Sequence, residues 1–208
     1  MTAEVTKPGR NTGGGGVFLY CVVETELGWC GLCSRGNGLW RTSSFHSGQK
    51  AALQALDLPT GAREERDDPL LRRAAHWLTG FSCGRPQADP IPLDLADTTH
   101  FSRSVLQECA KIPFGCIALY QELAVRAGSH RAARAVGQVM RRNRLAPFVP
   151  CHRVVGAEGW LTGFGGGLPL KARLLELEGW EVKRGPGEKW RLCMLQKLDS
   201  VQCLPQRG

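Results

Sequence analysis

Residues 119–142 read LYQELAVRAGSHRAARAVGQVMRR, and this stretch decides the fold of the second half of the chain. Its spacing predicts a helix over 119–127 that Gly128 ends. A second helix is expected over about 131–142, with Ser129 as its N-cap. Two short helices around a glycine turn, the second of them basic, are typical of a helix-turn-helix. An ordinary pair of packed helices stays open as the alternative.

The second helix separates its residues by face. Its apolar and small residues recur at helical spacing: Ala133, Val136, Gly137 and Met140. Its polar and basic residues lie on another side: Arg131, Arg134, Gln138 and Arg141. Small side chains let a helix approach a groove or a neighbouring helix closely. The arginines favour the groove of a nucleic acid over simple helix packing.

The charge of the chain points the same way. The 208 residues contain 27 Lys and Arg against 19 Asp and Glu, a formal net charge of +8. Seven arginines and no acidic residue lie between Arg126 and Arg153. Such a local positive charge is typical of a surface that binds a polyanion, and nucleic acid is the usual polyanion. A solvated basic surface, or an acidic protein partner, is the alternative.

The sequence argues against a membrane protein, a secreted protein and a zinc finger. No apolar run is long enough for a membrane span, and residues 1–16 lack the apolar segment of a secretory signal. The nine cysteines are an odd number, which indicates a reducing compartment and mostly free thiols. Cys30 and Cys33 have the spacing of half a zinc site, and twelve residues separate Cys33 from His46. The second histidine of a finger is absent, so half-buried thiols in a strand are expected and zinc is not supported.

The first half reads as a small α/β domain after a disordered tail over 1–16. Strands are expected over 17–23, 27–33 and 38–45, and helices over 49–58 and 69–78. Asp67 or Asp68 is the expected N-cap of the second helix, and Gly80 its stop. A proline-rich linker follows, so we place the boundary of this domain, residues 17–98, there.

The second half, residues 99–185, reads as a mainly helical, winged-helix-like domain. Beyond the helix-turn-helix we expect the following elements: a helix over 99–111, a turn at 113–115, a glycine loop over 163–167 and a helix over 168–179. A short strand is expected over 190–195, and residues 186–208 read as a tail. The fold class is therefore α/β, with a sheet-and-helix domain before a helical one.

Residues 148–155 read FVPCHRVV, apolar at both ends and polar in the middle. Such a stretch is expected to enter the core and expose its centre. Cys151 and His152 are adjacent, and neighbours in a strand point to opposite faces. A direct Cys–His pair therefore needs irregular backbone or a water between the two side chains. An inert core thiol is the alternative for Cys151 in isolation.

The stretch 150–154, PCHRV, resembles the active-site motif of the O6-alkylguanine-DNA alkyltransferases. Other pieces resemble this family in the same order: residues 112–115, 120–124, 133–137 with Asn143, and 165–167 with Lys171, 174–175 and 178–179. The ordered set runs from Ile112 to Gly179, about a third of the chain. The first hundred residues match only loosely, at residues 24–28.

The resemblance implies a role for each matched residue. Cys151 would take the alkyl group, His152 would deprotonate it through a water, and Glu178 would orient that histidine. Asn143 would tie the recognition helix to the active-site loop, Tyr120 would donate to the flipped guanine, and Lys171 would act near its O6. Arg134 would enter the base stack from the minor groove. Further DNA contacts are expected from Gln121, Ala133, Arg141 and Ser129. The substrate pocket is expected to include Phe164, Gly165, Gly166, Met140 and Val154.

The resemblance also implies chemistry and partners. A free thiol has a pKa near 8.5, so a neighbouring imidazole backed by a carboxylate raises its reactive fraction. The target base must leave the duplex before a thiol can reach it. Displacement at the alkyl carbon gives a thioether, which no ordinary hydrolysis breaks, so the protein reacts once. We expect a monomer without cofactor or metal that repairs O6-alkylguanine, and O4-alkylthymine, in double-stranded DNA. Its place would be the nucleus of a eukaryote or otherwise the cytoplasm.

Two positions depart from the family pattern. Phe164 stands where the family often has Tyr, and Ala146 stands where some members have Pro. Three other classes stay open: a cysteine protease, a non-catalytic relative that only binds alkylated DNA, and a helix-turn-helix regulator. The protease lacks a second supported histidine, the binding-only relatives lack the cysteine, and the regulator leaves Cys151, His152 and Glu178 unexplained.

Overall fold

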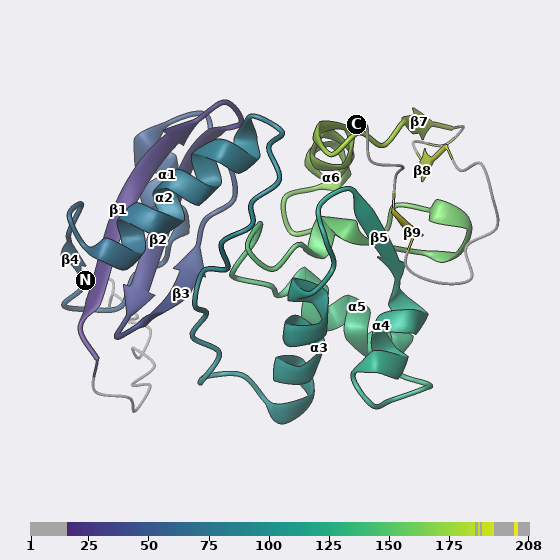
Figure 1. Cartoon of the computed structure of the whole chain (residues 1–208), viewed down its shortest axis with the longest axis horizontal. Coiled ribbons are helices and arrows are strands. Elements are labelled where there is room, and N and C mark those ends of the chain that lie inside the picture. Colours follow the sequence, from purple (N-terminus) through teal and green to yellow (C-terminus); the bar gives the residue numbers. More distant parts are fainter. Residues whose placement is uncertain (1–15, 186, 188, 194–201, 204–208) are drawn as a thin grey trace, which may run out of the picture.

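The computed structural model describes residues 16–185, 187, 189–193 and 202–203. Two halves lie side by side, a sheet with two helices and a mainly helical part (Figure 1). The tail expected over 1–16 falls outside the described residues except for Gly16, whereas the one expected over 186–208 includes described residues that form two short strands. In the described part, no helix is both long and apolar enough to cross a membrane.

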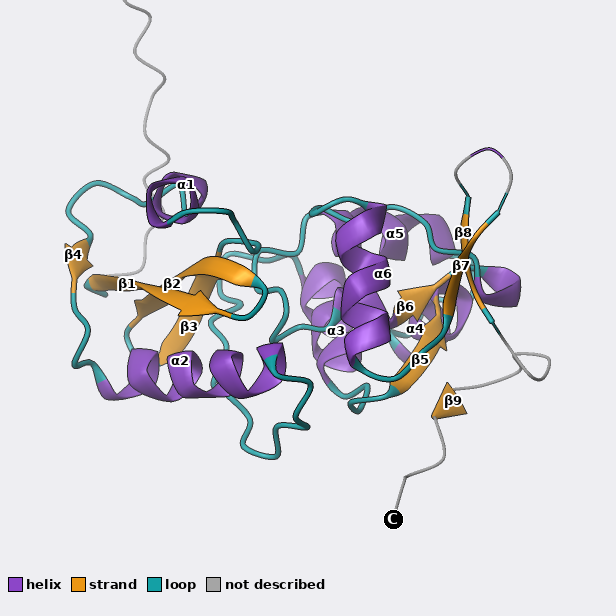
Figure 2. Cartoon of the chain, turned by 90° about the horizontal axis from the view of Figure 1, so that it is seen from above, coloured by secondary structure: helices purple, strands orange, loops and turns teal. Residues whose placement is uncertain are grey.

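The first half is a sheet between two helices. Its elements are β1 (Phe18–Thr25), β2 (Gly28–Arg35), β3 (Gly38–Thr42), α1 (Gln49–Ala55), β4 (Arg63–Glu64) and α2 (Pro69–Ser82). The strand order is β3-β2-β1-β4, with β4 parallel to β1 and the other pairs antiparallel. Helices α1 and α2 cover opposite faces of this sheet (Figure 2). The three strands and two helices expected here are present, and the two-residue β4 is an addition.

The alternation of side chains along β2 explains this layering. Cys30 and Leu32 belong to the core cluster that contains α2, whereas Cys33 packs with Leu56, which follows α1. Gly31 faces α1, where a Cβ would lie 2.5 Å from Leu56 Cγ, so only glycine allows this close approach. Cys30 and Cys33 are both fully buried rather than half-buried, and they lie on opposite faces. They do not form half of a zinc site.

The ends of α2 test the predicted caps. Asp68 is the N-cap, and its side chain accepts a hydrogen bond from Leu71 N at 2.9 Å. The predicted stop at Gly80 is wrong, because the helix continues through it to Ser82. A Cβ on Gly80 would lie 2.5 Å from Gln87 Nε2, so this glycine makes room for a side chain. The left-handed residue that follows the helix is Gly84, with φ of +73°.

The second half is mainly helical. Its regular elements are α3 (His100–Ala110), β5 (Cys116–Leu119), α4 (Tyr120–Arg126), α5 (Ala133–Arg141), β6 (Val154–Val155), α6 (Leu168–Leu177), β7 (Val182–Arg184), β8 (Trp190–Leu192) and β9 (Gln202–Cys203). Two 3-10 turns complete it, η1 (Cys151–Arg153) and η2 (Ala157–Gly159). Strand β5 pairs with β6 in parallel and with β9 antiparallel, and β7 pairs with β8. Of these strands, only β8 was expected.

Helices α4 and α5 form the expected pair, and Val136 and Met140 of α5 are buried. The N-cap of α5 is Ala132, without a side-chain cap, so the prediction of Ser129 as N-cap is wrong. The turn explains this difference. Ser129 N donates to Ala124 O at 2.8 Å and Ala132 N donates to Ser129 O at 3.3 Å. Because of this extra turn, α5 begins only at Ala133, too far along the chain for Ser129 to be its N-cap.

The two halves share one apolar core and several polar contacts. Thr42, at the end of β3, donates from its backbone N to Arg144 O at 2.7 Å and from Oγ1 to Ala146 O at 2.5 Å. The Arg144 guanidinium lies 4.8 Å from the Trp40 ring and pairs with Asp97 at 3.3 Å. The first half thus holds the loop that follows α5, in which the peptide before Pro147 is cis.

Cysteine pairing agrees with the expectation of mostly free thiols, with one disulfide in addition. Cys116 of β5 and Cys203 of β9 form a disulfide. The other seven cysteines are free: Cys21, Cys30, Cys33, Cys83, Cys109, Cys151 and Cys193. Sequence spacing could not reveal the pairing of two strands 87 residues apart.

Candidate active site

The candidate site is built on the 3-10 turn η1. Cys151, His152 and Arg153 are 3%, 0% and 7% exposed, so the expectation that the centre of 148–155 is exposed is wrong. Burial is tolerated because the Arg153 side chain turns inward and is paired there. The turn also supplies the irregular backbone that an adjacent Cys and His require. Strand β6 follows directly and anchors the turn against β5.

Asn143 holds the thiol of Cys151. Its Nδ2 donates to Cys151 Sγ at 3.1 Å and to Val149 O at 2.8 Å, and its Oδ1 accepts from Leu145 N at 3.0 Å. Burial raises the pKa of the Cys151 thiol, while the hydrogen bond from Asn143 and the charge of Lys171 act in the opposite direction. Asn143 follows α5 closely, so it links the helix-turn-helix to the thiol.

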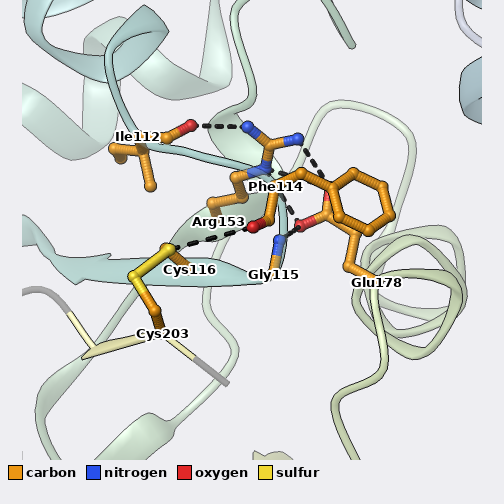
Figure 3. Close-up of a disulfide and its surroundings, with 7 residues drawn as sticks. All are labelled: Ile112, Phe114, Gly115, Cys116, Arg153, Glu178 and Cys203. Carbon is orange, nitrogen blue, oxygen red and sulfur yellow. Dashed lines mark hydrogen bonds and ion pairs between the residues drawn. A yellow bond between two sulfur atoms is a disulfide. The ribbon is translucent and has the colours of Figure 1, made fainter. Parts of the chain in front are cut away.

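A carboxylate lies behind the turn, at the C-terminal end of α6. Glu178 Oε1 lies 2.8 Å from His152 Nε2, and both oxygens accept from Arg153 Nε, at 2.9 and 3.0 Å. Arg153 Nη2 donates to Oε1 at 2.8 Å, and Gly115 N donates to Oε2 at 3.0 Å. Figure 3 shows Arg153 lying between this carboxylate and the carbonyl of Ile112, to which Nη1 donates at 2.5 Å. We call Glu178, His152, Arg153 and the Gly115 N–H the carboxylate cluster.

Charges in the carboxylate cluster compensate for burial. Burial would raise the pKa of Glu178, but the hydrogen bonds from His152 and Arg153 and the charge of Arg153 outweigh it and lower that pKa. Burial lowers the pKa of His152, and the neighbouring Glu178 only partly offsets this effect. His152 is therefore neutral at neutral pH. With Nε2–H donating to Glu178, its buried Nδ1 is an acceptor with no hydrogen-bond partner among the described residues.

Lys171 and Tyr120 contact each other near the thiol. Lys171 is fully buried, and its Nζ donates to Val154 O at 2.6 Å, Thr162 O at 3.1 Å and Tyr120 Oη at 3.4 Å. Burial lowers its pKa to about 8. Tyr120 Oη donates to Thr162 O at 3.2 Å, and burial raises the pKa of its phenol. Because three protein oxygens engage the ammonium group, the geometry favours a positioning role over the direct role near O6 that we expected.

The residues expected to bind DNA lie on and before α5. Arg134 and Arg141 are exposed, and Ala133 is half-buried at the first turn. Gln121, on α4, is exposed and donates through Nε2 to the His130 carbonyl, so it braces the turn between the helices. Ser129 is half-buried in that turn. The contacts of these side chains with DNA stay predictions.

The residues expected in the substrate pocket divide into two groups. Gly165 and Gly166 are exposed and line a cleft beside Asn143. Met140 and Val154 are buried in the core cluster that contains Cys151, and half-buried Phe164 packs against that cluster. The first group is open to a ligand in this structure. For the second group, contact with a base stays a prediction.

Several residues that shape the site were missed from the sequence. Arg153 belongs to the quoted motif, yet among so many arginines it was given no role. The apolar residues on both sides of it were the available signal that this arginine is buried. No pattern in the sequence indicated that Thr42 or the carbonyl of Thr162 would shape the site. Among the described residues, no group of three or more His, Cys, Asp or Glu is placed to hold a metal ion.

Comparisons with known proteins agree with one another. Residues 100–180 match the family model described as "6-O-methylguanine DNA methyltransferase, DNA binding domain". A methylated-DNA–protein-cysteine methyltransferase from Methanosarcina barkeri is 35% identical over 159 residues, 76% of this chain and 96% of the relative. The protein of that name from Mycobacterium tuberculosis is 43% identical over 159 residues, 76% of this chain and 91% of the relative.

Solved structures give the same picture. The Mycobacterium tuberculosis O6-methylguanine methyltransferase superposes with a TM-score of 0.63 at 31% identity, covering 78% of this chain and 93% of that one. A structure of the same organism's protein described as being in complex with DNA gives 0.65 at 32% identity, covering 77% and 92%. The mixed α/β fold that we expected matches that of these structures.

Proposed function

The chain belongs to the family of methylated-DNA–protein-cysteine methyltransferases, and on that premise we propose that Cys151 is the residue that takes the alkyl group. The protein repairs DNA by direct transfer of an alkyl group to a cysteine. The hydrogen bond from Asn143 Nδ2 to Cys151 Sγ, in a turn whose next residue is backed by Glu178, carries the assignment. The substrate we propose is O6-alkylguanine in double-stranded DNA, with O4-alkylthymine as a second one.

The proposed reaction is one displacement. The Cys151 thiol gives its proton to His152 Nδ1 through a water, because this nitrogen is the acceptor left over by the hydrogen bond to Glu178. The thiolate attacks the alkyl carbon, a sulfur–carbon bond forms, and the bond from that carbon to O6 breaks. The electron pair stays on the leaving guanine, and the product thioether is stable. Each molecule therefore reacts once.

Tyr120 is the proposed donor to the leaving base. Burial raises its pKa, so the phenol keeps its proton at neutral pH and can donate it. The hydroxyl turns from the Thr162 carbonyl to the guanine, and Lys171, which donates to both oxygens, keeps it in place. Lys171 is thus a positioning residue in this proposal. Phe164 lacks a hydroxyl, so it contributes its ring alone.

DNA reaches this site through the helix-turn-helix. We propose that α5 enters the minor groove and that exposed Arg134 fills the space of the flipped nucleotide. Phosphate contacts from Arg141 and from the turn before α5 offset the cost of flipping. The protein acts as a monomer in this proposal, in the compartment that holds chromosomal DNA: the nucleus of a eukaryote or the cytoplasm of a prokaryote.

Mass spectrometry tests the proposal. The full chain is mixed with a duplex that contains one O6-methylguanine, digested, and mapped peptide by peptide. We expect one added methyl on the Cys151 peptide, in an amount that equals the protein at saturation, and none with unmodified duplex. Binding without any methyl gain would identify a non-catalytic relative. A methyl on another cysteine would disprove the assignment of Cys151.

A further inference from the structure

A cleft of about 470 Å³ lies where the first half of the chain meets the end of α5 and the glycine loop. Its polar lining comes from both halves: Arg41, Ser44 and His46 from the first, and Arg141, Arg142 and Arg144 from the second. We call these six residues the arginine cleft. No Asp or Glu is among the described residues that line it. The lining of the cleft therefore carries a net positive charge.

Two of the arginines are held rigidly. Arg41 Nη1 donates to Leu56 O at 3.0 Å and pairs with Asp57 at 2.8 Å, and its guanidinium lies 5.0 Å from the Trp40 ring. Arg144 lies on the same ring and pairs with Asp97. Some nitrogens of the side chains that line the cleft have no hydrogen-bond partner. Arg41 Nε, Arg144 Nε and His46 Nε2 are buried with no hydrogen-bond partner in the described part of the chain. Unpaired buried nitrogens in a native protein require an explanation, such as a bound water or ion, or a partner that they reach after a small shift.

The cleft adjoins the proposed site of alkyl transfer. Asn143, whose Nδ2 donates to Cys151 Sγ, lines the cleft, as do Gly165 and Gly166. Glycine lets a backbone or a ligand approach closely at these two positions. A DNA strand that delivers a base to Cys151 must continue past these residues.

The charge balance decides which ligand fits. The C-terminal end of α5 carries a partial negative charge that would by itself repel an anion. Arg41 and Arg144 are already paired with Asp57 and Asp97, so exposed Arg141 and Arg142 supply the net positive charge that outweighs it, and both can adjust to a backbone. A guanidinium pairs with phosphate oxygens through two hydrogen bonds.

From this arrangement we propose that the arginine cleft binds a backbone phosphate of the DNA strand that carries the damaged base. The first half of the chain is then part of the DNA-binding surface rather than only a support. This inference rests on the proposed function. The same oxyanion chemistry is shared by free inorganic phosphate, which the experiment must separate from DNA.

Ser44→Glu places a carboxylate in the cleft at a half-buried position without removing any arginine. Thr60→Glu is the matched control, an exposed position in the same half that makes the same charge change outside the cleft. Binding of the full-length variants to an unmodified duplex is measured by fluorescence anisotropy. We expect Ser44→Glu to weaken binding about tenfold relative to Thr60→Glu. Reaction with free O6-benzylguanine should be unchanged in both. Equal affinities of the two variants for DNA would overturn the proposal.

A second pair tests the phosphate contact without adding a charge. Arg142→Gln removes a cleft arginine, and Arg72→Gln removes an exposed arginine on α2. Arg142→Gln alone should lower the slope of log affinity against log salt by about 1. An unchanged slope contradicts the proposal even if Ser44→Glu disturbs the fold.

Inorganic phosphate distinguishes the two sources of oxyanion. If millimolar phosphate stabilises the wild type against heat but not Ser44→Glu, while both bind DNA equally, the cleft serves a free anion and the proposal is wrong. Mass spectrometry of the Cys151 peptide runs in parallel. Methyl transfer with no effect of either cleft variant refutes this inference alone, whereas absence of transfer refutes the proposed function.

Discussion

Cys151 and His152 are neighbours in the chain, yet their surroundings differ in how firmly polar groups are held. The Cys151 thiol accepts its hydrogen bond from the single side chain of Asn143, at 3.1 Å. Behind His152, the Glu178 carboxylate receives four N–H groups, from Gly115, His152 and twice from Arg153. The reacting sulfur thus has one side-chain hydrogen-bond partner, while the carboxylate that orients its base has four N–H donors.

This difference fits a protein that reacts once. A sulfur that becomes a thioether must give up the hydrogen bond from Asn143 and accept a new substituent, and losing one side-chain partner costs little. The base must stay in one tautomer and one orientation, which several fixed donors ensure. Substitutions on the two sides of η1 should therefore fail in different ways. On the thiol side they should change chemistry, and in the carboxylate cluster they should change both chemistry and stability.

The largest effect is expected for Cys151→Ala. Loss of the sulfur removes the acceptor, so transfer should fall to zero, while DNA affinity and the free energy of unfolding change little. Mass spectrometry and anisotropy on the same preparation check both points. Methyl transfer that persists would assign the reaction to one of the other eight cysteines.

Glu178→Gln tests the carboxylate cluster. The buried Arg153 loses its counter-charge, which should lower the free energy of unfolding by about 3 kcal/mol. The imidazolium of His152 becomes harder to form, so transfer should slow and the apparent pKa of Cys151 should rise. Urea unfolding and the rate of thiol alkylation against pH measure the two effects separately.

Arg153→Met serves as the partner variant. It removes the charge of Arg153 while Glu178 keeps its hydrogen bonds from His152 and Gly115. We expect the apparent pKa of Cys151 to change less than in Glu178→Gln, although stability also falls. If Glu178→Gln alters neither stability nor the alkylation profile, the carboxylate cluster is not the rigid support that its contacts indicate.

Arg134→Ala addresses the surface outside η1. An inserted side chain matters only when a base must leave a stack, so repair in duplex DNA should slow by about tenfold or more, since unstacking costs a few kcal/mol. Reaction with free O6-benzylguanine should be unaffected. Single-turnover rates on both substrates provide the comparison. Equal losses would make Arg134 a structural residue or a plain phosphate contact.

The chemistry of the site was easier to predict than its shape. Cys151, His152 and Glu178 carry side chains with a recognisable task, and their order along the chain matched a known family. The helix-turn-helix was predicted because its apolar positions recur over two full helices. Strands β5 and β6 were missed because four and two residues show no period.

The supporting contacts could not be predicted for a different reason. Arg153 lies among arginines that point to solvent, and only its burial against Glu178 distinguishes it. The bond from Thr42 to Ala146 spans 104 residues and joins two ordinary-looking positions. The same holds for the Cys116–Cys203 disulfide. Such pairs depend on the packing of the two halves, which no local pattern encodes.

The smallest effect is expected for Thr42→Val, which asks whether the first half helps to set the thiol side. Valine keeps the shape of threonine and the backbone bond to Arg144, but it removes the hydroxyl that donates to Ala146 O. Loss of one such bond costs about 1 kcal/mol.

The loop that Thr42 holds begins at Asn143 and ends at Cys151, so loosening it should reach the hydrogen bond between them. We expect reaction with free O6-benzylguanine to slow by a few-fold, since 1 kcal/mol corresponds to about a fivefold change, with DNA affinity unchanged. Thr98→Val is the control, because its hydroxyl makes a local bond to Leu95 O at 2.6 Å that does not touch the loop. If both variants lose the same stability and neither slows the reaction, the first half supports the fold without positioning the thiol.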